Sequence, residues 1–374
     1  MLLWSGASVA AEHVFRDGFE PPRLRGVNIA GMEMAYFNYP QATGPVAGGN
    51  YAVLDTGLID YYAGKQVRVL RLLFSWEAMQ PQLGDPIPAA AGNYRAYFDN
   101  YKRIVDYATD VQGMQVVIEP WQADAGGGAG GARWRGMPVG SAQVPVSAFA
   151  GFWAAMAAQF RDNGLVSYGL VNEPNNMSTM QWFAAAQAAI DAIRAAGSSQ
   201  RILVPGNGYS AASTWTSSSY DTGSPQRSNA YGWLNANGPG QPLHDPAGRI
   251  AAEVHTYLDS WECACSDTPD AISSTHAASD HLAVVVDEAR AHGYRVWLGE
   301  IGFYAGNAIA AATWADFVAY ADANRDTLEG YAWWAGGMPA WWPDVHAPHF
   351  SVAPTDAASL DGDSINMDLI EPDF

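Results

Sequence analysis

Two carboxyl side chains in this sequence stand where each could meet a substrate. Glu173 lies in the run Gly169-Leu-Val-Asn-Glu-Pro174, and Glu300 lies in the run Val296-Trp-Leu-Gly-Glu-Ile-Gly302. In each run, apolar residues typical of a buried strand lead directly to the acid, so each carboxyl is expected at a strand end. Glycoside hydrolysis needs two converging carboxyls, one protonated and one ionised. Like charges about 5 Å apart raise the pKa of one group and leave the other low.

Short apolar runs alternate with amphipathic stretches along most of the chain, and this alternation predicts the scaffold. The predicted strands are rich in Val, Ile, Leu and aromatic residues and comprise Leu24–Ala30, Gln66–Phe74, Met114–Glu119, Val166–Asn172, Arg201–Val204, Ala251–His255, Arg295–Glu300 and Leu328–Trp334. The predicted helices between them are Tyr97–Thr109, Val146–Asn163, Thr179–Ala196, His276–His292 and Ala311–Arg325. This repeat predicts an α/β fold, a (β/α)8 TIM barrel with long loops on its catalytic face. A doubly wound open sheet is the alternative, because periodicity does not count strands.

Two long segments without a regular pattern follow predicted strands. Gln122–Gly136 carries a run of glycines, and Gly206–Pro246 is rich in Ser, Asn, Gly and Pro. Segments that follow strands form the catalytic face of such a barrel, so we expect both loops near the substrate. The alternative is that the glycines mark only a mobile insertion. The glycine run also contains G-x-G-x-x-G spacing, but no helix opens on it, so a dinucleotide site is not expected.

The composition excludes some partners and favours others. The chain has 38 Asp and Glu against 19 Lys and Arg, a net charge of −19 at pH 7. Such a surface repels nucleic-acid phosphates and anionic lipid. The 15 Trp and 18 Tyr suit flat ligands such as sugars, or else they fill the core. Aromatic residues that follow predicted strands, and so could contact a sugar, are Trp76, Tyr209, Trp215, Trp341 and Trp342; those read as packing are Trp4, Trp153, Trp182, Trp297 and Trp314.

The chain divides into a short N-terminal segment and one domain. Residues 1–20 read as a signal remnant or a disordered tail, and residues 21–374 as a single domain. No segment reaches the roughly 18 apolar residues that span a bilayer, so we expect a secreted or periplasmic protein. Cys263 and Cys265 make neither a disulfide framework nor a four-ligand zinc site, and both free thiols and a local bridge stay open.

Six motifs, in their order along the chain, together resemble a known family. They are Arg25-Gly-Val-Asn-Ile-Ala-Gly31, Leu70-Arg-Leu-Leu-Phe-Ser-Trp-Glu77, Asn172-Glu-Pro174, Glu253-Val-His-Thr-Tyr-Leu-Asp259, Gly299-Glu-Ile-Gly302 and Gly330-Tyr-Ala-Trp-Trp-Ala335. In this order and spacing the chain resembles glycoside hydrolase family 5, the cellulase-type retaining glycosidases, and its bacterial endoglucanases in particular. The resemblance covers the chain from about Leu24 to Glu371.

The resemblance implies roles for the two carboxyls and their neighbours. Glu173 corresponds to the general acid/base and Glu300 to the nucleophile. Asn172 would bind the 2-hydroxyl of the sugar in the −1 subsite. Arg71 would hold Glu300 ionised, and Tyr257 would donate a hydrogen bond to it. Read alone, Arg71 could equally be a structural ion pair.

Two further residues carry an implied role, and one position departs from the family pattern. His255 would line the same subsite, and Trp334 would stack on the sugar ring; the alternatives are a satisfied core histidine and a packed tryptophan. The third strand of the family usually ends in an acid-Pro-His-Asn pattern. Here it reads Glu119-Pro-Trp-Gln122, so Trp121 replaces the histidine and alters the shape of the −1 or −2 subsite.

These observations predict one function and leave alternatives. We expect a retaining endo-glycosidase that hydrolyses internal β-1,4-glucosidic bonds of cellulose-like polysaccharides. An endo-β-mannanase, a xyloglucanase and a non-catalytic carbohydrate-binding barrel are the alternatives. The partner is a polysaccharide, with no nucleic acid and no membrane, and we expect a monomer. The chemistry requires no cofactor and no metal.

Overall fold

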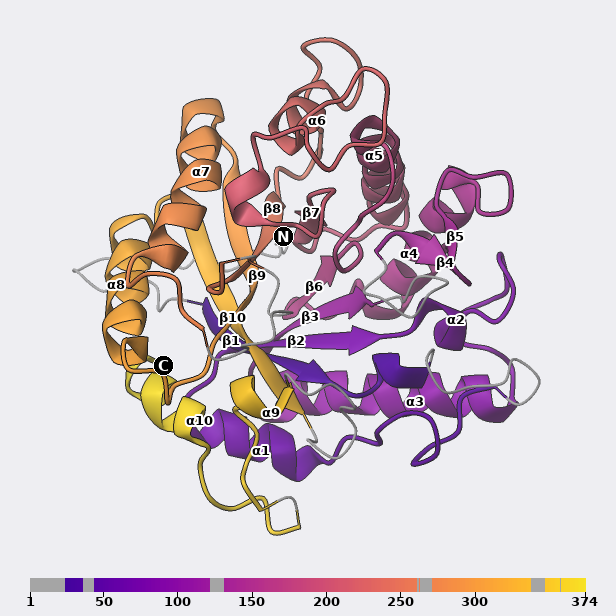
Figure 1. The fold of residues 1–374 in the computed structure, drawn as a ribbon. Coiled ribbons are helices and arrows are strands. Elements are labelled where there is room, and N and C mark those ends of the chain that lie inside the picture. The colour runs from indigo at the N-terminus through magenta and orange to yellow at the C-terminus, as the bar shows by residue number, and fades with distance from the viewer. Residues whose placement is uncertain are drawn as a thin grey trace, which may run out of the picture.

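Eight parallel strands close into a barrel in the computed structural model, which describes residues 24–35, 44–121, 131–260, 262, 271–337, 347–356 and 358–374 (Figure 1). Around the barrel the order is β1 (Leu24–Ala30), β2 (Val69–Phe74), β3 (Gln115–Pro120), β6 (Val166–Gly169), β7 (Ile202–Pro205), β8 (Ile250–Tyr257), β9 (Arg295–Gly302) and β10 (Leu328–Gly337). β1 pairs with both β2 and β10, which closes the ring. The predicted (β/α)8 barrel is confirmed, and the closed ring excludes the open sheet.

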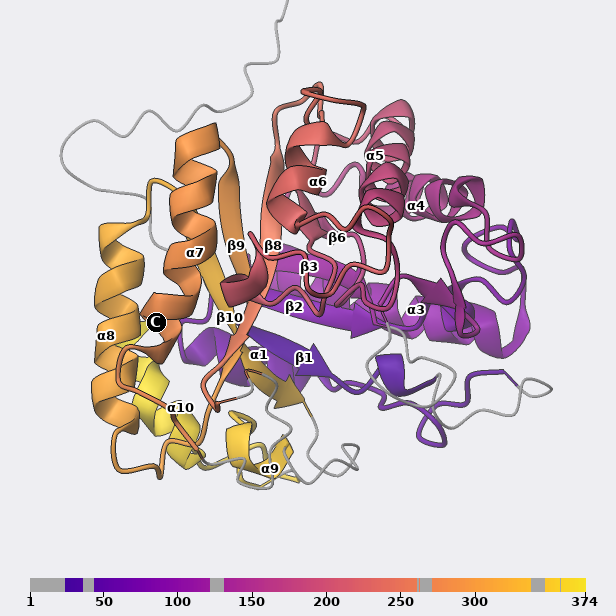
Figure 2. The same ribbon diagram turned by 45° about the horizontal axis from the view of Figure 1, so that its top comes forward.

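Helices cover the outside of the barrel, as Figure 2 shows from a second direction. The predicted helices correspond to α3 (Gly92–Asp106), α4 (Val146–Phe160), α5 (Thr179–Ala195), α7 (Ala277–His292) and α8 (Ala310–Ala323). Shorter elements that the sequence pattern does not reveal are α1 (Thr56–Gly64), α2 (Trp76–Met79), α6 (Asn229–Asn235), α9 (Ala347–Phe350), α10 (Ile365–Ile370) and the hairpin of β4 (Arg133–Trp134) and β5 (Met137–Pro138).

The segment Gly206–Pro246 is not a loop throughout, because it contains α6. The Ser228 side chain accepts a hydrogen bond from Tyr231 N and caps the first turn of this helix. Trp233, on the same helix, is buried and stacks on Tyr294 at 4.7 Å between ring centroids. The Ser228 cap and the buried Trp233 ring stabilise this two-turn helix, which composition alone does not predict.

Buried tryptophans tie the helices to the strand ends that carry the site. Trp153 on α4 donates from Nε1 to the carbonyl of Leu170, just after β6. Trp182 on α5 donates to the carbonyl of Pro205 at the end of β7. Trp297 and Trp314 are also buried, so the reading of these four rings as packing is confirmed. Helix positions therefore fix the mouth of the barrel directly.

The interior of the barrel is apolar at one level and polar at the next. The apolar layer contains Val69, Val117, Leu203, Ala251, Trp297 and Ala332. Side chains alternate along a strand, so the next inward positions lie two residues further on. On β1, β2, β3 and β8 these positions hold Asn28, Arg71, Glu119 and Glu253, all fully buried. Buried polar groups of this density mark a site rather than a packing core.

Several sequence predictions lie outside the described residues: the N-terminal segment with Trp4, residues 122–130 of the glycine-rich loop, Cys263, Cys265, Trp341 and Trp342. In the part of the chain that is described, no helix has both the length and the apolar character needed to cross a bilayer.

Candidate active site

The two carboxyls meet at one end of the barrel. Glu173 follows β6, and Glu300 lies near the end of β9, so both are at the carboxyl ends of parallel strands. One oxygen of each carboxyl and a ring nitrogen of His255 all lie within 4.8 Å of one another. Retaining glycosidases hold their two carboxyl groups about 5 to 5.5 Å apart, whereas inverting enzymes separate them further to admit a water molecule. The spacing fits retention of configuration.

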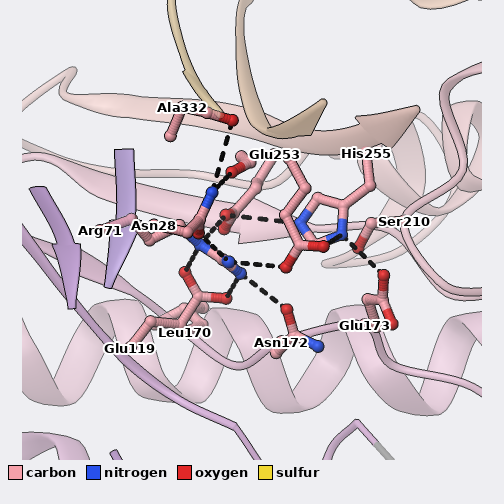
Figure 3. Close-up of polar contacts among 12 residues, drawn as sticks. Asn28, Arg71, Glu119, Leu170, Asn172, Glu173, Ser210, Glu253, His255 and Ala332 are labelled. Atoms are coloured by element: carbon pink, nitrogen blue, oxygen red, sulfur yellow. Dashed lines mark hydrogen bonds and ion pairs between the residues drawn. The ribbon is translucent and has the colours of Figure 1, made fainter. Parts of the chain in front are cut away.

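Glu300 is held by two donors, one on each oxygen. Arg71 Nη1 donates to Oε1 at 2.7 Å, and Tyr257 Oη donates to Oε2 at 2.6 Å. Arg71 also donates to Asn28 Oδ1 and Asn172 Oδ1, both at 2.7 Å (Figure 3). Short hydrogen bonds of this kind fix the orientation of the carboxyl group.

Glu173 has a different environment, and its electrostatics differ accordingly. Its side chain is 13% exposed, and its Oε1 lies 2.8 Å from His255 Nδ1. Burial, together with the negative charge of Glu300, raises the pKa of Glu173, and the hydrogen bond from His255 only partly opposes this. A raised pKa at Glu173 and two short hydrogen bonds at Glu300 give the two carboxyls different environments, which suits the division of roles that general acid catalysis needs.

His255 carries a positive charge in this setting. Burial lowers its pKa, but the negative charge of Glu300, the hydrogen bond with Glu173 and the nearby Glu253 carboxyl outweigh burial and raise the pKa to about 10. Among the described residues, Glu173, His255 and Glu300 are the only group close enough to hold a metal ion. A protonated imidazole cannot bind a metal, and Arg71 already places a cation on Glu300. The arrangement fits proton transfer and not a metal centre.

Glu173 sits in strained backbone that its surroundings maintain. Its φ of 45° lies in the left-handed region, which non-glycine residues rarely adopt. Asn175 Nδ2 donates to the Glu173 carbonyl at 3.0 Å, and Gly208 N donates to the carbonyl of Pro174 at 2.7 Å. Gly131 also packs here: a Cβ on it would lie 2.4 Å from the Glu173 carbonyl oxygen. The described end of the glycine-rich loop thus supports the conformation of Glu173.

Asn172 is placed to serve a ligand. It is buried, and its Oδ1 accepts from Arg71, which orients the amide. Its Nδ2 is buried and has no hydrogen-bond partner among the described residues. A buried donor without a partner is costly, so this one is available for a substrate hydroxyl.

The aromatic predictions divide into those at the mouth and those in the core. Trp333 packs outward on Phe303 and Trp314, so its strand neighbour Trp334, which is half-buried, faces the barrel mouth. Trp121 is half-buried and directly follows β3. Tyr209 is 41% exposed beside Pro174, to whose carbonyl its backbone N–H donates.

Two of the aromatic predictions are wrong. Trp215 is fully buried, and its Nε1 donates to Tyr294 Oη at 2.9 Å, so it presents no face to a sugar. Trp76 is also fully buried, where it packs on Phe149 and Phe152. Both residues follow strands, but α6 and α4 cover them.

Sequence reasoning did not assign Asn28, Glu119 and Glu253 to the site. Asn28 Nδ2 donates to the carbonyls of Gly299 and Trp333, which joins β1 to β9 and β10. Glu119 and Glu253 both contact Arg71. A signal was present for Glu119 and Glu253, since each lies two residues beyond an inward apolar position of a predicted strand, Val117 and Ala251 respectively.

Comparison with known proteins agrees with this geometry. The family described as Cellulase (glycosyl hydrolase family 5) matches residues 23–337. Endo-β-1,4-glucanase B of Aspergillus niger is 30% identical over 332 residues, covering 87% of this chain and 84% of that protein. Endo-β-1,4-glucanase A of Emericella nidulans is 29% identical over 334 residues, covering 88% and 86%.

Solved structures give the same answer. An endo-β-1,4-glucanase from Xanthomonas axonopodis pv. citri has a TM-score of 0.79 at 28% identity, covering 94% of this chain and 98% of that one. XacCel5A in complex with cellopentaose has a TM-score of 0.78 at 28% identity, covering 94% and 99%. With the family match spanning every strand of the barrel, this chain belongs to glycosyl hydrolase family 5, the cellulase family, and is a glycoside hydrolase.

Proposed function

We propose that this chain hydrolyses internal β-1,4-glucosidic bonds of cellulose-like polysaccharides with retention of configuration. The observation that carries the proposal is the carboxyl pair: Glu173 and Glu300 approach within 4.8 Å, and Arg71 contacts only Glu300 of the two. Burial raises the pKa of Glu173, two donors hold Glu300, and the carboxyls lie at the separation that a double displacement requires.

The reaction proceeds in two steps. Glu300 attacks the anomeric carbon and forms a glycosyl–enzyme bond while Glu173 gives its proton to the departing glycosidic oxygen. A water molecule then gives a proton to the Glu173 carboxylate and attacks the same carbon, which releases Glu300. His255 stabilises the carboxylate that Glu173 becomes between the two steps, because its positive charge lies 2.8 Å away.

Residues around the pair bind the sugar. Asn172 Nδ2 donates to the 2-hydroxyl of the ring in the −1 subsite. Trp334 supports that ring by stacking, and Trp121 contacts the same or the next sugar. Tyr209 lies beside Pro174, on the leaving-group side of Glu173, so it forms a platform for the sugar that departs. A site open on both sides of the cleaved bond suits internal cleavage.

The substrate is a β-1,4-glucan in this proposal. The Aspergillus niger and Emericella nidulans relatives are endo-β-1,4-glucanases by name, and a solved structure at 28% identity holds cellopentaose. Mannan and xyloglucan stay as alternatives, because Trp121 changes the subsite that family members build around a histidine. We further propose that the protein is a monomer. We also propose that it is secreted or periplasmic, because polymeric cellulose-like polysaccharides are found outside the cytoplasm.

Product analysis on a panel of β-linked polysaccharides tests the proposal. Carboxymethylcellulose, β-glucan, mannan and xyloglucan are incubated with the full chain, and products are separated by chromatography. We expect short cello-oligosaccharides of mixed length from the glucans, with the β-anomer formed first in proton NMR spectra. Faster release of products from mannan or xyloglucan would change the assigned substrate to that polysaccharide. Binding without any product would indicate a non-catalytic barrel.

A further inference from the structure

One arginine beneath the reaction centre serves three buried carboxyl groups, and two of these take no part in the proposed hydrolysis. Arg71 donates from Nε and Nη2 to the two oxygens of Glu119 at 2.9 and 2.7 Å. Oε1 of Glu253 lies 3.0 Å from the same Nε (Figure 3). All of these side chains are buried, so water cannot disperse the excess negative charge.

Two glycines make room for this carboxyl pair. A Cβ on Gly169 would lie 2.0 Å from Glu119 Oε2, and a Cβ on Gly299 would lie 2.3 Å from Glu253 Oε1. Neither glycine has a positive φ, so space and not backbone conformation requires it. The two runs that lead to Glu173 and Glu300 therefore each contain a glycine that accommodates one member of the pair.

Glu253 lacks a hydrogen-bond donor in this arrangement. Arg71 Nε carries one hydrogen, which is directed at Glu119, and both Glu253 oxygens are buried without a hydrogen bond. His255 Nε2 is 3.8 Å away, too far for a hydrogen bond. One oxygen of Glu119 and one of Glu253 lie 2.9 and 3.0 Å from the same Arg71 Nε, and either carboxyl can act as a donor only if the pair retains a proton.

We propose that Glu119 and Glu253 share one proton at neutral pH, and that their single negative charge positions Arg71 for its contact with Glu300. The role of Glu300 in this inference rests on the proposed function. With one proton in the pair, Arg71 and the pair together are neutral, and protonated His255 balances ionised Glu300. If both carboxyls of the pair were ionised, their two negative charges would draw Arg71 away from Glu300. If both were protonated, Glu300 would be the only anion that contacts Arg71.

The electrostatics of the cluster support one retained proton. Burial, and to a lesser extent the charge of Glu253, raise the pKa of Glu119 to about 8 although Arg71 opposes them. For Glu253, burial raises the pKa, but Arg71 together with His255 and Glu119 overcomes this effect and lowers the pKa. Among the described residues, His255 on β8 and Tyr101 on α3 also interact electrostatically with the pair, and His255 in turn faces Glu300 on β9 and Glu173 after β6.

The proton belongs to the pair and not to one residue. The twofold contact with Arg71 favours an ionised Glu119, whereas burial, and to a lesser extent the charge of Glu253, favour protonation there. The chain offers a contrast in Arg194 and Asp245, which form the same fork at 2.7 and 2.9 Å. There one arginine contacts one carboxyl, and the hydrogen bonds that Asp245 accepts overcome burial and lower the pKa of Asp245.

Infrared spectroscopy and charge measurement on the full chain test the shared proton. The variants are Glu119→Gln, Glu253→Gln, the double variant, and Asp245→Asn as the matched ordinary fork. Each single variant of the pair should lose one protonated-carboxyl band at pH 7 and keep the net charge of the parent in capillary electrophoresis. The double variant should lose the same single band and become one unit more positive. Asp245→Asn should gain one unit and lose no such band.

Other outcomes overturn the proposal. A single variant that becomes more positive without losing a band would show that both carboxyls are ionised, and a double variant that loses two bands would show that both are protonated. In activity on soluble β-glucan, we expect kcat to fall less than about tenfold in each single variant and about a hundredfold or more in the double variant, with KM little changed. The bands and charges need no activity, so an inactive parent would refute the proposed function and leave this test intact.

Discussion

His255 Nδ1 lies 2.8 Å from Oε1 of Glu173, so a protonated imidazole touches the carboxyl proposed to give up its proton. The same nitrogen is 3.5 Å from Glu300 Oε2, and the His255 backbone N–H is fixed by the carbonyl of Ser210 at 2.8 Å. A fixed cation beside the acid stabilises the carboxylate that remains after proton transfer. It also limits how far burial can raise the pKa of the acid.

Replacing His255 should move the basic limb of the pH profile upward. His255 lowers the pKa of Glu173 through its hydrogen bond and its charge, against burial, which raises that pKa. With His255→Asn only the more distant charge of Arg71 still opposes the raising effect of burial and of Glu300, so Glu173 stays protonated to higher pH. We expect the basic limb of kcat/KM to rise by about one pH unit, with a lower maximum. An unchanged or lower basic limb would contradict this account of Glu173.

The two carboxyls should fail in different ways when replaced. Glu300→Gln removes the nucleophile, so we expect kcat to fall by a factor on the order of 10⁴ or more for every substrate. Glu173→Ala removes only the acid and base, so an aryl cellobioside with a good leaving group should still form the glycosyl–enzyme. Burst kinetics on that substrate distinguish the two variants. Equal loss in both variants on both substrates would contradict the assigned roles.

Folding stability should fall as pH rises from about 5 to 10. Burial, against opposing contacts, raises the pKa of Glu33 to about 7, and the pKa of His255 is raised to about 10 by neighbouring charges that overcome burial. The folded state therefore keeps protons that the unfolded chain releases near 4.5 and 6.5. The stability that each such proton contributes is fully present below the pKa of the group in the unfolded chain. It is lost at about 1.4 kcal/mol per pH unit as the pH rises from that value to the pKa in the folded state.

Urea unfolding at a series of pH values measures this slope. Glu33→Gln should flatten the curve between about pH 5 and 7, and His255→Asn should flatten it between about pH 7 and 10. Asp245, whose pKa is lowered, is ionised in both states over this range, so Asp245→Asn should shift the curve without changing its slope. Stability that rises over the range would show that these groups are not buried with their protons.

The scaffold could be predicted because the strands of a closed barrel are buried on both faces and stand out as short apolar runs. The predicted strand Leu24–Ala30 coincides with β1, and the two carboxyls follow such runs at the expected strand ends. Glu119 and Glu253 also lie in predicted strands, yet nothing local shows that they share an arginine. Only the register of β2, β3 and β8 around the closed ring brings these side chains together.

The sequence could not show which of the aromatic side chains that follow strands are buried and which are exposed. Trp215 and Tyr209 both follow β7, and their positions predict the same role. In the structure Trp215 lies under α6 against Trp233, while Tyr209 remains exposed. The difference arises from how the long segment folds back, which depends on packing between distant residues and not on local pattern.

Tyr209 should contribute to binding of the leaving group. It is 41% exposed, beside the loop that carries Glu173, with Tyr220 edge-on at 6.3 Å. Tyr209→Ala should lower kcat/KM about tenfold on cellopentaose and much less on an aryl cellobioside, whose leaving group does not reach the platform. Val111→Ala, an exposed residue before β3 at the other end of the barrel, serves as the control. Equal effects on both substrates would remove Tyr209 from the leaving-group side.

Gly131 should prove to be a positioning residue for Glu173. Its φ is +64°, and an added Cβ would lie 2.4 Å from the Glu173 carbonyl oxygen and 2.6 Å from Pro174 Cα. Gly131→Ala must therefore displace the loop that holds Glu173 in its own left-handed conformation. We expect kcat to fall about a hundredfold with KM little changed, because a misplacement of about 1 Å has this effect on a reacting group.

Gly113→Ala separates the steric effect from the cost of backbone conformation. Gly113 has nearly the same φ, +65°, but an added Cβ there would meet no atom within 4 Å. Both variants should lose about 1 to 2 kcal/mol of stability from the left-handed backbone. Only Gly131→Ala should also lose kcat, and it should retain glycosylation of an aryl cellobioside with a good leaving group, since that step does not need Glu173. Equal kcat in the two variants would mean that the glycine-rich loop does not position the acid.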